Sequence, residues 1–176
     1  MSLRTAQRAA VAALVLAGSG GLACQFDPVV DNAVSALGGE APGVRRGPTH
    51  RPGQPCLLCH DGALGDPPAF SLAGTIYQVP SSTFPETGAT VSFTDATGTT
   101  RSTTTNSVGN FYLTPSQWSP VFPLTNVTVM SSGGAKATMQ SEIGRDGACA
   151  TCHFDPAGPA SPGHVSIFLD DGGVPP

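Results

Sequence analysis

Residues 88–113 read GATVSFTDATGTTRSTTTNSVGNFYL, and this stretch decides the fold class. Apolar and polar residues alternate along it, because Val91 and Phe93 are each flanked by threonine or serine. Successive side chains of a strand point to opposite faces, so we expect Val91 and Phe93 to face a core, as do Phe111 and Leu113 further on. The stretch predicts three short strands, divided by glycine-bearing turns, over 90–94, 99–106 and 110–113.

The same threonine- and valine-rich character extends on both sides, over residues 69–137, and predicts further strands at 70–79 and 126–132. Short strands separated by turn signals at this spacing indicate a small antiparallel sandwich. The chain also has 22 glycine and 17 proline residues and few aromatic ones, without long helical periodicity. We therefore expect a mainly β fold built from turns and short strands, and not a helical bundle.

Four short motifs mark the turns of this region: Gly74-Thr75-Ile76, Gly88-Ala89-Thr90-Val91, Asp95-x-x-Gly98 and Thr105-Asn106-x-x-Gly109-x-Phe111. Together they resemble the repeated punctuation of carboxypeptidase-regulatory-like domains. The resemblance implies a seven-stranded, immunoglobulin-like sandwich without catalytic activity of its own. It weakens after Pro115. Gly98 suits a hairpin position with positive φ, and Gly109 allows a close approach of backbone before an inward aromatic.

The sandwich region lies between two copies of Cys-x-x-Cys-His, CLLCH at 56–60 and CATCH at 149–153. This string is the attachment signature of c-type haem. The two thiols are spaced to bond the two vinyl groups of one porphyrin, and the following imidazole is the proximal ligand of the iron. Two haem c groups are therefore predicted. The predicted cofactor-binding residues are Cys56, Cys59 and His60 in the first motif and Cys149, Cys152 and His153 in the second.

Other uses of paired cysteines are open. A redox disulfide of the thioredoxin type expects a βαβ pattern nearby, and the sequence shows none. Four cysteines in two pairs also suit a tetrahedral zinc site or two structural disulfides. In these cases the histidine directly after each pair has no required role, so haem is the preferred interpretation.

The distal ligands decide whether each iron only passes electrons or has an open position for chemistry. His50, six residues before Cys56, is the predicted distal ligand of the first haem. For the second, Met139 and His164 compete, and Met139 is placed slightly ahead because it precedes its motif as His50 does. A thioether ligand would raise the reduction potential relative to two imidazoles. Met130 is expected in the core instead.

The N-terminal 23 residues have the features of a targeting segment. Arg4 and Arg8 precede an apolar stretch, 9–17, that is too short to span a bilayer. The small residues that follow end at Cys24 and resemble a bacterial lipoprotein processing site, which implies lipidation of Cys24. The alternative is an ordinary signal peptide that leaves Cys24 as a spare thiol. Either way, the chain is predicted to be exported to the periplasm or cell surface. The lipoprotein interpretation adds a lipid anchor in the outer membrane.

Without residues 1–23 the chain has six basic and twelve acidic residues, a formal charge of −6, which argues against a nucleic-acid partner. We expect the sandwich to bring both motifs close, because neither flank can bury a haem alone. The predicted organisation is a signal peptide (1–23), a flexible tether in which 27–37 favour a short helix (24–48), a first haem-binding segment with one helical turn (49–68), the sandwich (69–137) and a second haem-binding segment with a closing strand (138–176).

This order resembles exported bacterial multihaem cytochromes in which a β-domain lies between attachment sites. The resemblance implies an electron carrier, not an enzyme, whose partners are redox proteins such as other cytochromes, and assembly with other haem proteins. The membrane is reached only through the anchor at Cys24. Two alternatives remain. One is a dihaem enzyme such as a peroxidase, and the other is a surface binding lipoprotein whose cysteine pairs are zinc or disulfide staples.

Overall fold

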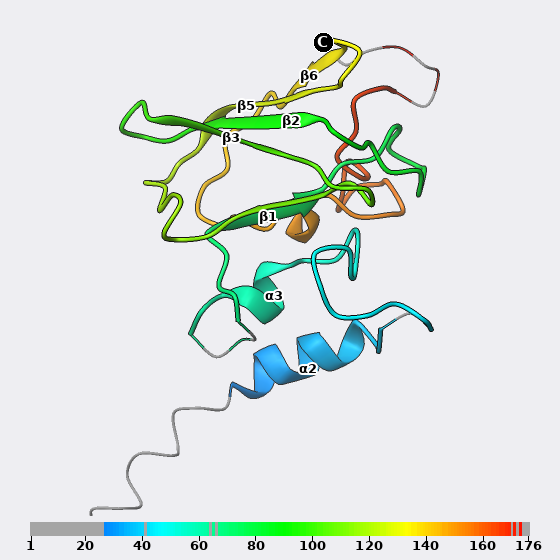
Figure 1. Cartoon of the computed structure of the whole chain (residues 1–176), viewed down its shortest axis with the longest axis vertical. Helices are drawn as coiled ribbons and strands as arrows, with labels where there is room; N and C mark the ends of the chain where they lie inside the picture. Colours follow the sequence, from blue (N-terminus) through cyan, green and yellow to red (C-terminus); the bar gives the residue numbers. More distant parts are fainter. Residues whose placement is uncertain are drawn as a thin grey trace, which may run out of the picture.

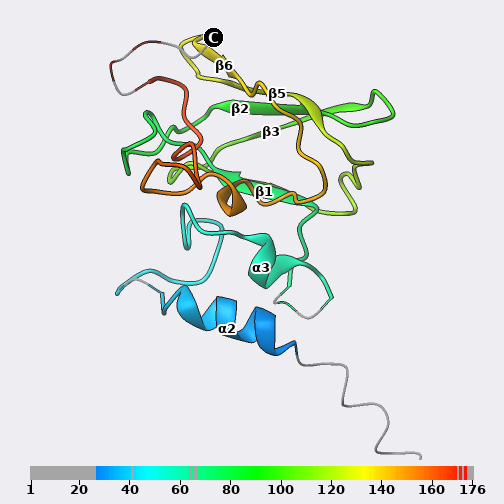
Figure 2. The same ribbon diagram turned by 180° about the vertical axis from the view of Figure 1, so that it is seen from behind.

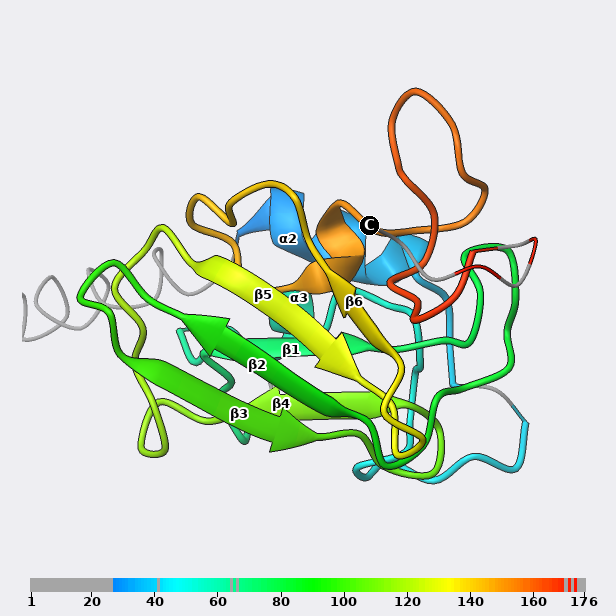
Figure 3. The ribbon, with the colours of Figure 1, turned by 90° about the horizontal axis from the view of Figure 1, so that it is seen from above.

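A computed structural model describes residues 27–40, 42–63, 65, 67–169, 171 and 173 of the chain. Within them, two antiparallel sheets face each other (Figures 1 and 3). The prediction of a mainly β fold is therefore confirmed. The first sheet pairs β1 (Leu72–Thr75) with β4 (Asn110–Leu113). The second has the order β3 (Thr100–Thr104), β2 (Thr90–Thr94), β5 (Thr125–Met130) and β6 (Lys136–Thr138).

The core between the sheets contains the side chains that the alternation placed inward. Val91 and Phe93 of β2 are 1% and 0% exposed, and Phe111 and Leu113 of β4 are also buried. The rings of Phe93 and Phe111 lie 5.9 Å apart and join the two sheets. Each buried side chain of this size contributes about 1.5–3 kcal/mol. Met130, by contrast, is half-exposed at the end of β5, so its predicted core position is wrong.

A carboxylate closes the hairpin between β2 and β3. Asp95 accepts hydrogen bonds from the N–H (2.9 Å) and hydroxyl (2.6 Å) of Thr97 and from the N–H of Thr99 (3.0 Å). The hydroxyl of Thr97 is the main reason that the pKa of Asp95 lies below its usual value. Gly98 adopts a φ of +83°, as this turn requires.

The turn before β4 brings two backbone segments into contact. Gly109 has a φ of +78°, and a Cβ atom there would lie 2.3 Å from the carbonyl oxygen of Ile76. The N–H of Ile76 donates to the carbonyl of Gly109 over 2.9 Å. The predicted close approach at this glycine is therefore confirmed.

The strand predicted over 70–79 is regular only as far as β1, and beyond it the chain pairs through single bridges. The N–H of Tyr77 donates to the carbonyl of Val165 (2.9 Å), so the C-terminal segment runs parallel to it. Ile167 in that segment is fully buried in the core. The closing strand predicted at 164–169 is thus a bridge-paired segment and not a regular strand.

Helix α2 (Pro28–Ala36) begins after Asp27, whose carboxylate accepts backbone N–H groups of its first turn. It packs beside α3 below the sandwich (Figures 1 and 2). An ion pair of 3.1 Å joins Glu40, just after the helix, to Arg51. We expected a flexible tether over 24–48; its described part is instead tied to the body by these contacts.

Both motifs form short helical turns next to β1. The first is α3 (Leu57–His60), which matches the predicted turn, and the second is the 3₁₀ turn η1 (Cys149–Thr151). In Figures 1 and 2 the orange η1 lies between β1 and α3. Among the described residues, no helix has the length and apolar character needed to cross a membrane.

Candidate functional site

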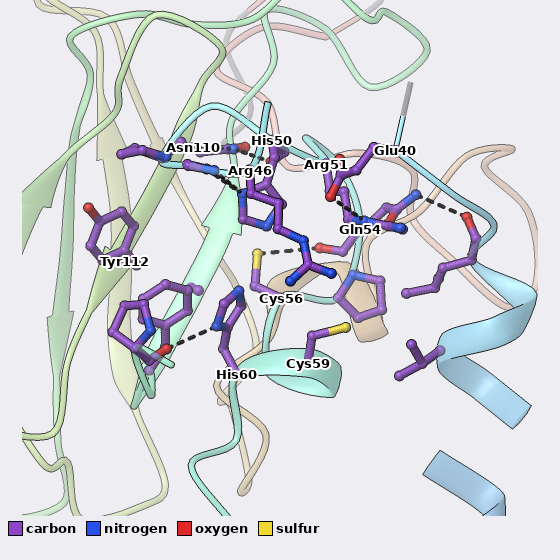
Figure 4. A pocket seen from close by; sticks show the side chains of 18 of the residues that line it. Glu40, Arg46, His50, Arg51, Gln54, Cys56, Cys59, His60, Asn110 and Tyr112 are labelled. Carbon is purple, nitrogen blue, oxygen red and sulfur yellow. Dashed lines mark hydrogen bonds and ion pairs between the residues drawn. The ribbon is translucent and has the colours of Figure 1, made fainter. Parts of the chain in front are cut away.

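A cavity of about 610 Å³ lies between α2, the first motif and the β1–β4 sheet (Figure 4). This volume is typical of sites for cofactors and small molecules. Its lining combines apolar side chains (Val34, Leu37, Phe70, Ala73, Phe111 and Tyr112), the motif residues Cys56, Cys59 and His60, and polar ones (Glu40, Arg46, His50, Arg51, Gln54 and Asn110). The predicted residues of the first motif and His50 therefore share one hollow.

The imidazole of His60 is held in one orientation and one tautomer. His60 is the last residue of α3 and is 7% exposed. Its Nδ1 lies 2.9 Å from the carbonyl oxygen of Pro68, and since a carbonyl only accepts, Nδ1–H donates. The lone pair is then on Nε2, the nitrogen that ligates a metal in this arrangement. The ring packs on Phe70, with centroids 4.5 Å apart, and Phe70 stacks on Tyr112.

His50 lies across the cavity from His60. The ring centroids are 5.8 Å apart and the planes are tilted by 52°. Two imidazoles on opposite sides of one metal ion place their coordinating nitrogens roughly 4 Å apart, and hence their ring centres about 6 Å apart. Nδ1 of His50 contacts both the N–H and the carbonyl oxygen of Gly47, so the backbone engages this nitrogen and not Nε2. The structure thus brings together the two histidines predicted for the first motif.

The sandwich holds the backbone of the His50 loop through two buried side chains. The amide of Asn110 donates to the carbonyl oxygens of His50 (3.0 Å) and Pro48 (3.3 Å). Its Oδ1 accepts from the hydroxyl of Thr75 (2.7 Å), and that hydroxyl accepts from the N–H of Gly53 (2.8 Å). Sequence reasoning missed both side chains, because their motifs indicate only turns and strand entries.

From the helix side, Arg51 holds the same loop. Its guanidinium donates to Glu40, to the carbonyl of Gly38 (2.7 Å) and to the side-chain oxygen of Gln54 (2.8 Å). Arg51 has a φ of +48°, a conformation that costs a non-glycine residue of order 1 kcal/mol. The loop of His50 is therefore fixed from two directions.

The second motif is seated on the edge of β1 that β4 leaves open. The N–H of Ala73 donates to the carbonyl of Gly147 (2.9 Å), and Ala73 forms a parallel bridge with Ala148. Cys149 then packs against Gly74, where a Cβ atom would lie 2.9 Å from the Cys149 Sγ. The absence of a side chain at Gly74 therefore makes room for this cysteine.

His153 is oriented by the same device as His60. Its Nδ1–H donates to the carbonyl oxygen of Gly163 (3.2 Å), which leaves the lone pair on Nε2. Burial lowers the pKa of His153 and outweighs the opposite effect of the bond to Gly163. The ring is therefore neutral near pH 7, the form in which imidazole binds metals. Cys152 of this motif is exposed.

The two motifs lie next to each other. The side chain of Leu57 comes within 3.3 Å of the position that a Cβ of Gly147 would occupy. Burial raises the pKa of the Cys56 thiol to about 11 and that of Cys149 to about 12, and the nearby Cys56 adds to the shift at Cys149. The described structure thus agrees with the expectation that the sandwich brings the motifs together.

The two candidates for the second distal ligand have different surroundings. His164 stacks on Tyr77, with centroids 4.2 Å apart, and its Nδ1–H donates to the carbonyl of Ser82 (3.0 Å). It directly follows Gly163, which holds the His153 ring. Met139 packs against the hydrophobic core of the sandwich. His164 is therefore attached to the second motif segment, whereas the Met139 side chain contributes to the core.

The described residues contain neither a disulfide nor a cluster of side chains arranged to bind zinc. No disulfide links the four motif cysteines to each other. A structural zinc site needs four ligands around one point. Within residues 27–40, 42–63, 65, 67–169, 171 and 173, no group of three or more His, Cys, Asp and Glu side chains could hold a metal ion. Cys24, the predicted lipidation site, lies outside the described residues.

No family model, curated protein or solved structure matches the chain. Its function is therefore inferred from the residues and the geometry described above.

Proposed function

We propose that the chain is an exported electron-transfer protein that carries two covalently attached c-type haems, one at each Cys-x-x-Cys-His motif. One observation carries this proposal: the ring centroids of His50 and His60 lie 5.8 Å apart in a cavity that is also lined by Cys56 and Cys59. A disulfide gives no role to this pair of rings. A zinc staple would use both rings with the two thiols as a Cys2His2 set, but among the described residues these side chains do not converge on one point as such a site requires. A haem would be attached through the two thiols, and the two imidazoles would hold its iron.

The cavity fits a haem in its chemistry as well as in its size. Cys56 and Cys59 supply the two thiols for thioether bonds, and Phe70 and Tyr112 provide an apolar wall that excludes water. The Arg46 side chain points into the cavity between the motif and His50 (Figure 4). Its positive charge would neutralise the negative charge of the haem propionates there. When bound, the haem supplies an iron that changes its oxidation state by one electron.

For the second haem we propose His153 as the proximal ligand and His164 as the distal one. The sequence placed Met139 slightly ahead, but its side chain contributes to the sandwich core, and a ligand there would have to leave that packing. His164 has the backbone contact at Nδ1 that all four histidines share, with Nε2 left for a metal. If both histidine pairs held their irons, neither iron would have an open position, which favours an electron carrier over an enzyme such as a peroxidase.

The closeness of the motifs supports electron transfer between the haems. Cys56 and Cys149 are 93 residues apart in the sequence, yet Cys149 packs against Gly74 of β1, and Cys56 lines the same cavity as Ala73 of that strand. Porphyrins attached at these thiols would both be positioned by the same strand, β1. We propose that this strand sets the separation of the two redox centres.

We further propose the cellular setting that the sequence implies. The protein is exported to the periplasm or cell surface and is held in the outer membrane by a lipid at Cys24. Its partners are other redox proteins, in particular cytochromes with a basic patch, and it assembles with other haem proteins. Two facing sheets support the carboxypeptidase-regulatory-like resemblance, and we propose that the bridge-paired segment around Ile167 takes the place of the seventh strand of an immunoglobulin-like sandwich.

A potentiometric titration of the protein, made in a host with cytochrome c maturation, tests this proposal. We expect two haems per chain by pyridine haemochrome. In the spectrum of the native protein both should be low-spin, and both should be reducible and inert to carbon monoxide. Replacing the first cysteine pair or the second by serine should each remove one haem, so that each variant is the control for the other. A high-spin iron that binds peroxide in the intact protein would favour a dihaem enzyme. Zinc in place of iron would favour a binding lipoprotein whose cysteine pairs hold a structural zinc ion.

A further inference from the structure

We propose that Asn110 is the positioning residue for His50, so that the β-sandwich itself controls the coordination of the first iron. This inference rests on the proposed function and adds a part to it. The sandwich is then the frame of the haem site, not a spacer between two attachment motifs. Neither the motif nor its spacing indicates this role, because Asn110 follows His50 by 60 residues.

The first step is the direct contact between Asn110 and the loop. Its amide donates to the carbonyl oxygen of His50 itself and to that of Pro48, two residues earlier in the same loop. The side chain is 8% exposed, so water does not replace these bonds readily. Asn106, in the turn before β4, donates to the same Pro48 carbonyl over 2.6 Å. The main chain that carries the distal imidazole is therefore bonded directly to β4 and its turn.

The second step is the support of Asn110 from β1. Thr75 is its cross-strand partner, and the hydroxyl of Thr75 donates to the side-chain oxygen of Asn110 (2.7 Å). This bond fixes which end of the amide is the donor, because the oxygen is already turned toward Thr75. The same hydroxyl accepts the N–H of Gly53, at the other end of the His50 loop. The end of the β1–β4 pair thus holds the loop on both sides of His50.

The third step connects this clamp to the iron. A distal ligand keeps an iron six-coordinate only while its loop stays in place, and a loop that leaves exposes an open position. Each neutral hydrogen bond that is lost shifts such an equilibrium by about 5.5-fold, so the loss of both Asn110 bonds should increase the open fraction by about 30-fold. A residue with a merely structural role would lower stability without a change in the coordination of one haem.

The test uses the dihaem protein and measures carbon monoxide binding to the reduced form, together with the high-spin absorption of the oxidised form. We expect Asn110→Ala to increase carbon monoxide binding at one haem about 30-fold, and Thr75→Val, an isosteric change, to have a similar effect. His50→Ala marks the fully open state, and adding Asn110→Ala to it should change nothing further. The matched control is Thr125→Val, which removes a hydroxyl bond to the Thr94 carbonyl on the other sheet.

The outcomes separate this inference from the proposed function. If His50→Ala opens one iron while folded Asn110→Ala and Thr75→Val both behave like the unchanged protein, Asn110 does not position the ligand and only this inference fails. If His50→Ala changes neither spectrum nor binding in a protein with two haems, His50 is not the ligand and the inference fails with it. A protein without covalent haem overturns both. If Asn110→Ala does not fold, carbon monoxide binding to Thr75→Val decides whether the clamp positions His50.

Discussion

Gly74 lies where β1 touches the second motif, and it has no room for a side chain. A Cβ atom there would lie 2.9 Å from both Cβ and Sγ of Cys149 and 3.0 Å from the ring of Phe111. Carbon atoms in good contact are about 3.5–4.0 Å apart, so Gly74→Ala creates overlaps of at least about 0.5 Å. Neither neighbour moves readily, because Phe111 is buried and the Cys149 segment is bridged to β1. Overpacking of this kind lowers the free energy of unfolding by about 1–3 kcal/mol.

The assay is urea unfolding of the dihaem protein followed by circular dichroism, with a potentiometric titration of each variant. With an m value of about 2 kcal/mol/M, the urea midpoint of Gly74→Ala should fall by about 0.5–1.5 M. The potential of the second haem should shift while that of the first does not. Gly144→Ala is the matched control, because no atom lies within 4 Å of a Cβ there. Equal midpoints and equal potentials in the two variants would refute the packing of Cys149 on β1.

Three further predictions concern charge and ligands. Asp95→Asn should destabilise the protein at pH 7, and the difference should narrow as the pH falls below about 4, because a carboxyl with a lowered pKa stabilises the fold only while it is ionised. Arg46→Gln should lower the potential of one haem by about 20–50 mV, because a cation in the cavity disfavours ferric iron, and Arg45→Gln should not. His164→Ala should open the second iron to carbon monoxide, whereas Met139→Ala should only lower stability.

Each of these has a result that contradicts it. A stability difference for Asp95→Asn that is the same at pH 7 and pH 3 in urea unfolding would show that its ionisation contributes nothing. Equal shifts in potential for the Arg46 and Arg45 variants would indicate a general charge effect and no cavity contact. If Met139→Ala changes the spectrum while His164→Ala behaves like the unchanged protein, the Met139 thioether is the distal ligand of the second haem.

The sequence predicted those elements whose pattern is local. The bounds of β2 and β4 match the predictions, because alternation and flanking turns define both ends. The strand predicted over 70–79 is shorter, since regular pairing with β4 stops at Thr75. The three-residue β6 was not predicted, because it is too short for a period to show. Met130 was assigned to the core, although the alternation with Val129 puts it on the outer face.

In the candidate site, too, the sequence predicted the residues with a local pattern and missed those that only packing brings together. Cys56, Cys59 and His60 form a motif within five residues, and His50 is near enough in sequence to be considered with them. The contact between Asn110 and the His50 loop, however, depends on how β4 lies against that loop. A glycine inside a strand does indicate a close backbone approach, but not that Cys149 makes it at Gly74. Such long-range contacts follow from the packing of the sandwich and have no sequence period.

The intact mass of the denatured protein, exported from a host with cytochrome c maturation, tests the central claim most directly. Thioether bonds survive unfolding, whereas haem held only by axial ligands is lost. We expect the polypeptide to retain the mass of two haems, and peptides containing 56–60 and 149–153 to carry one each. A polypeptide mass without haem, or with haem at only one motif, would contradict the account.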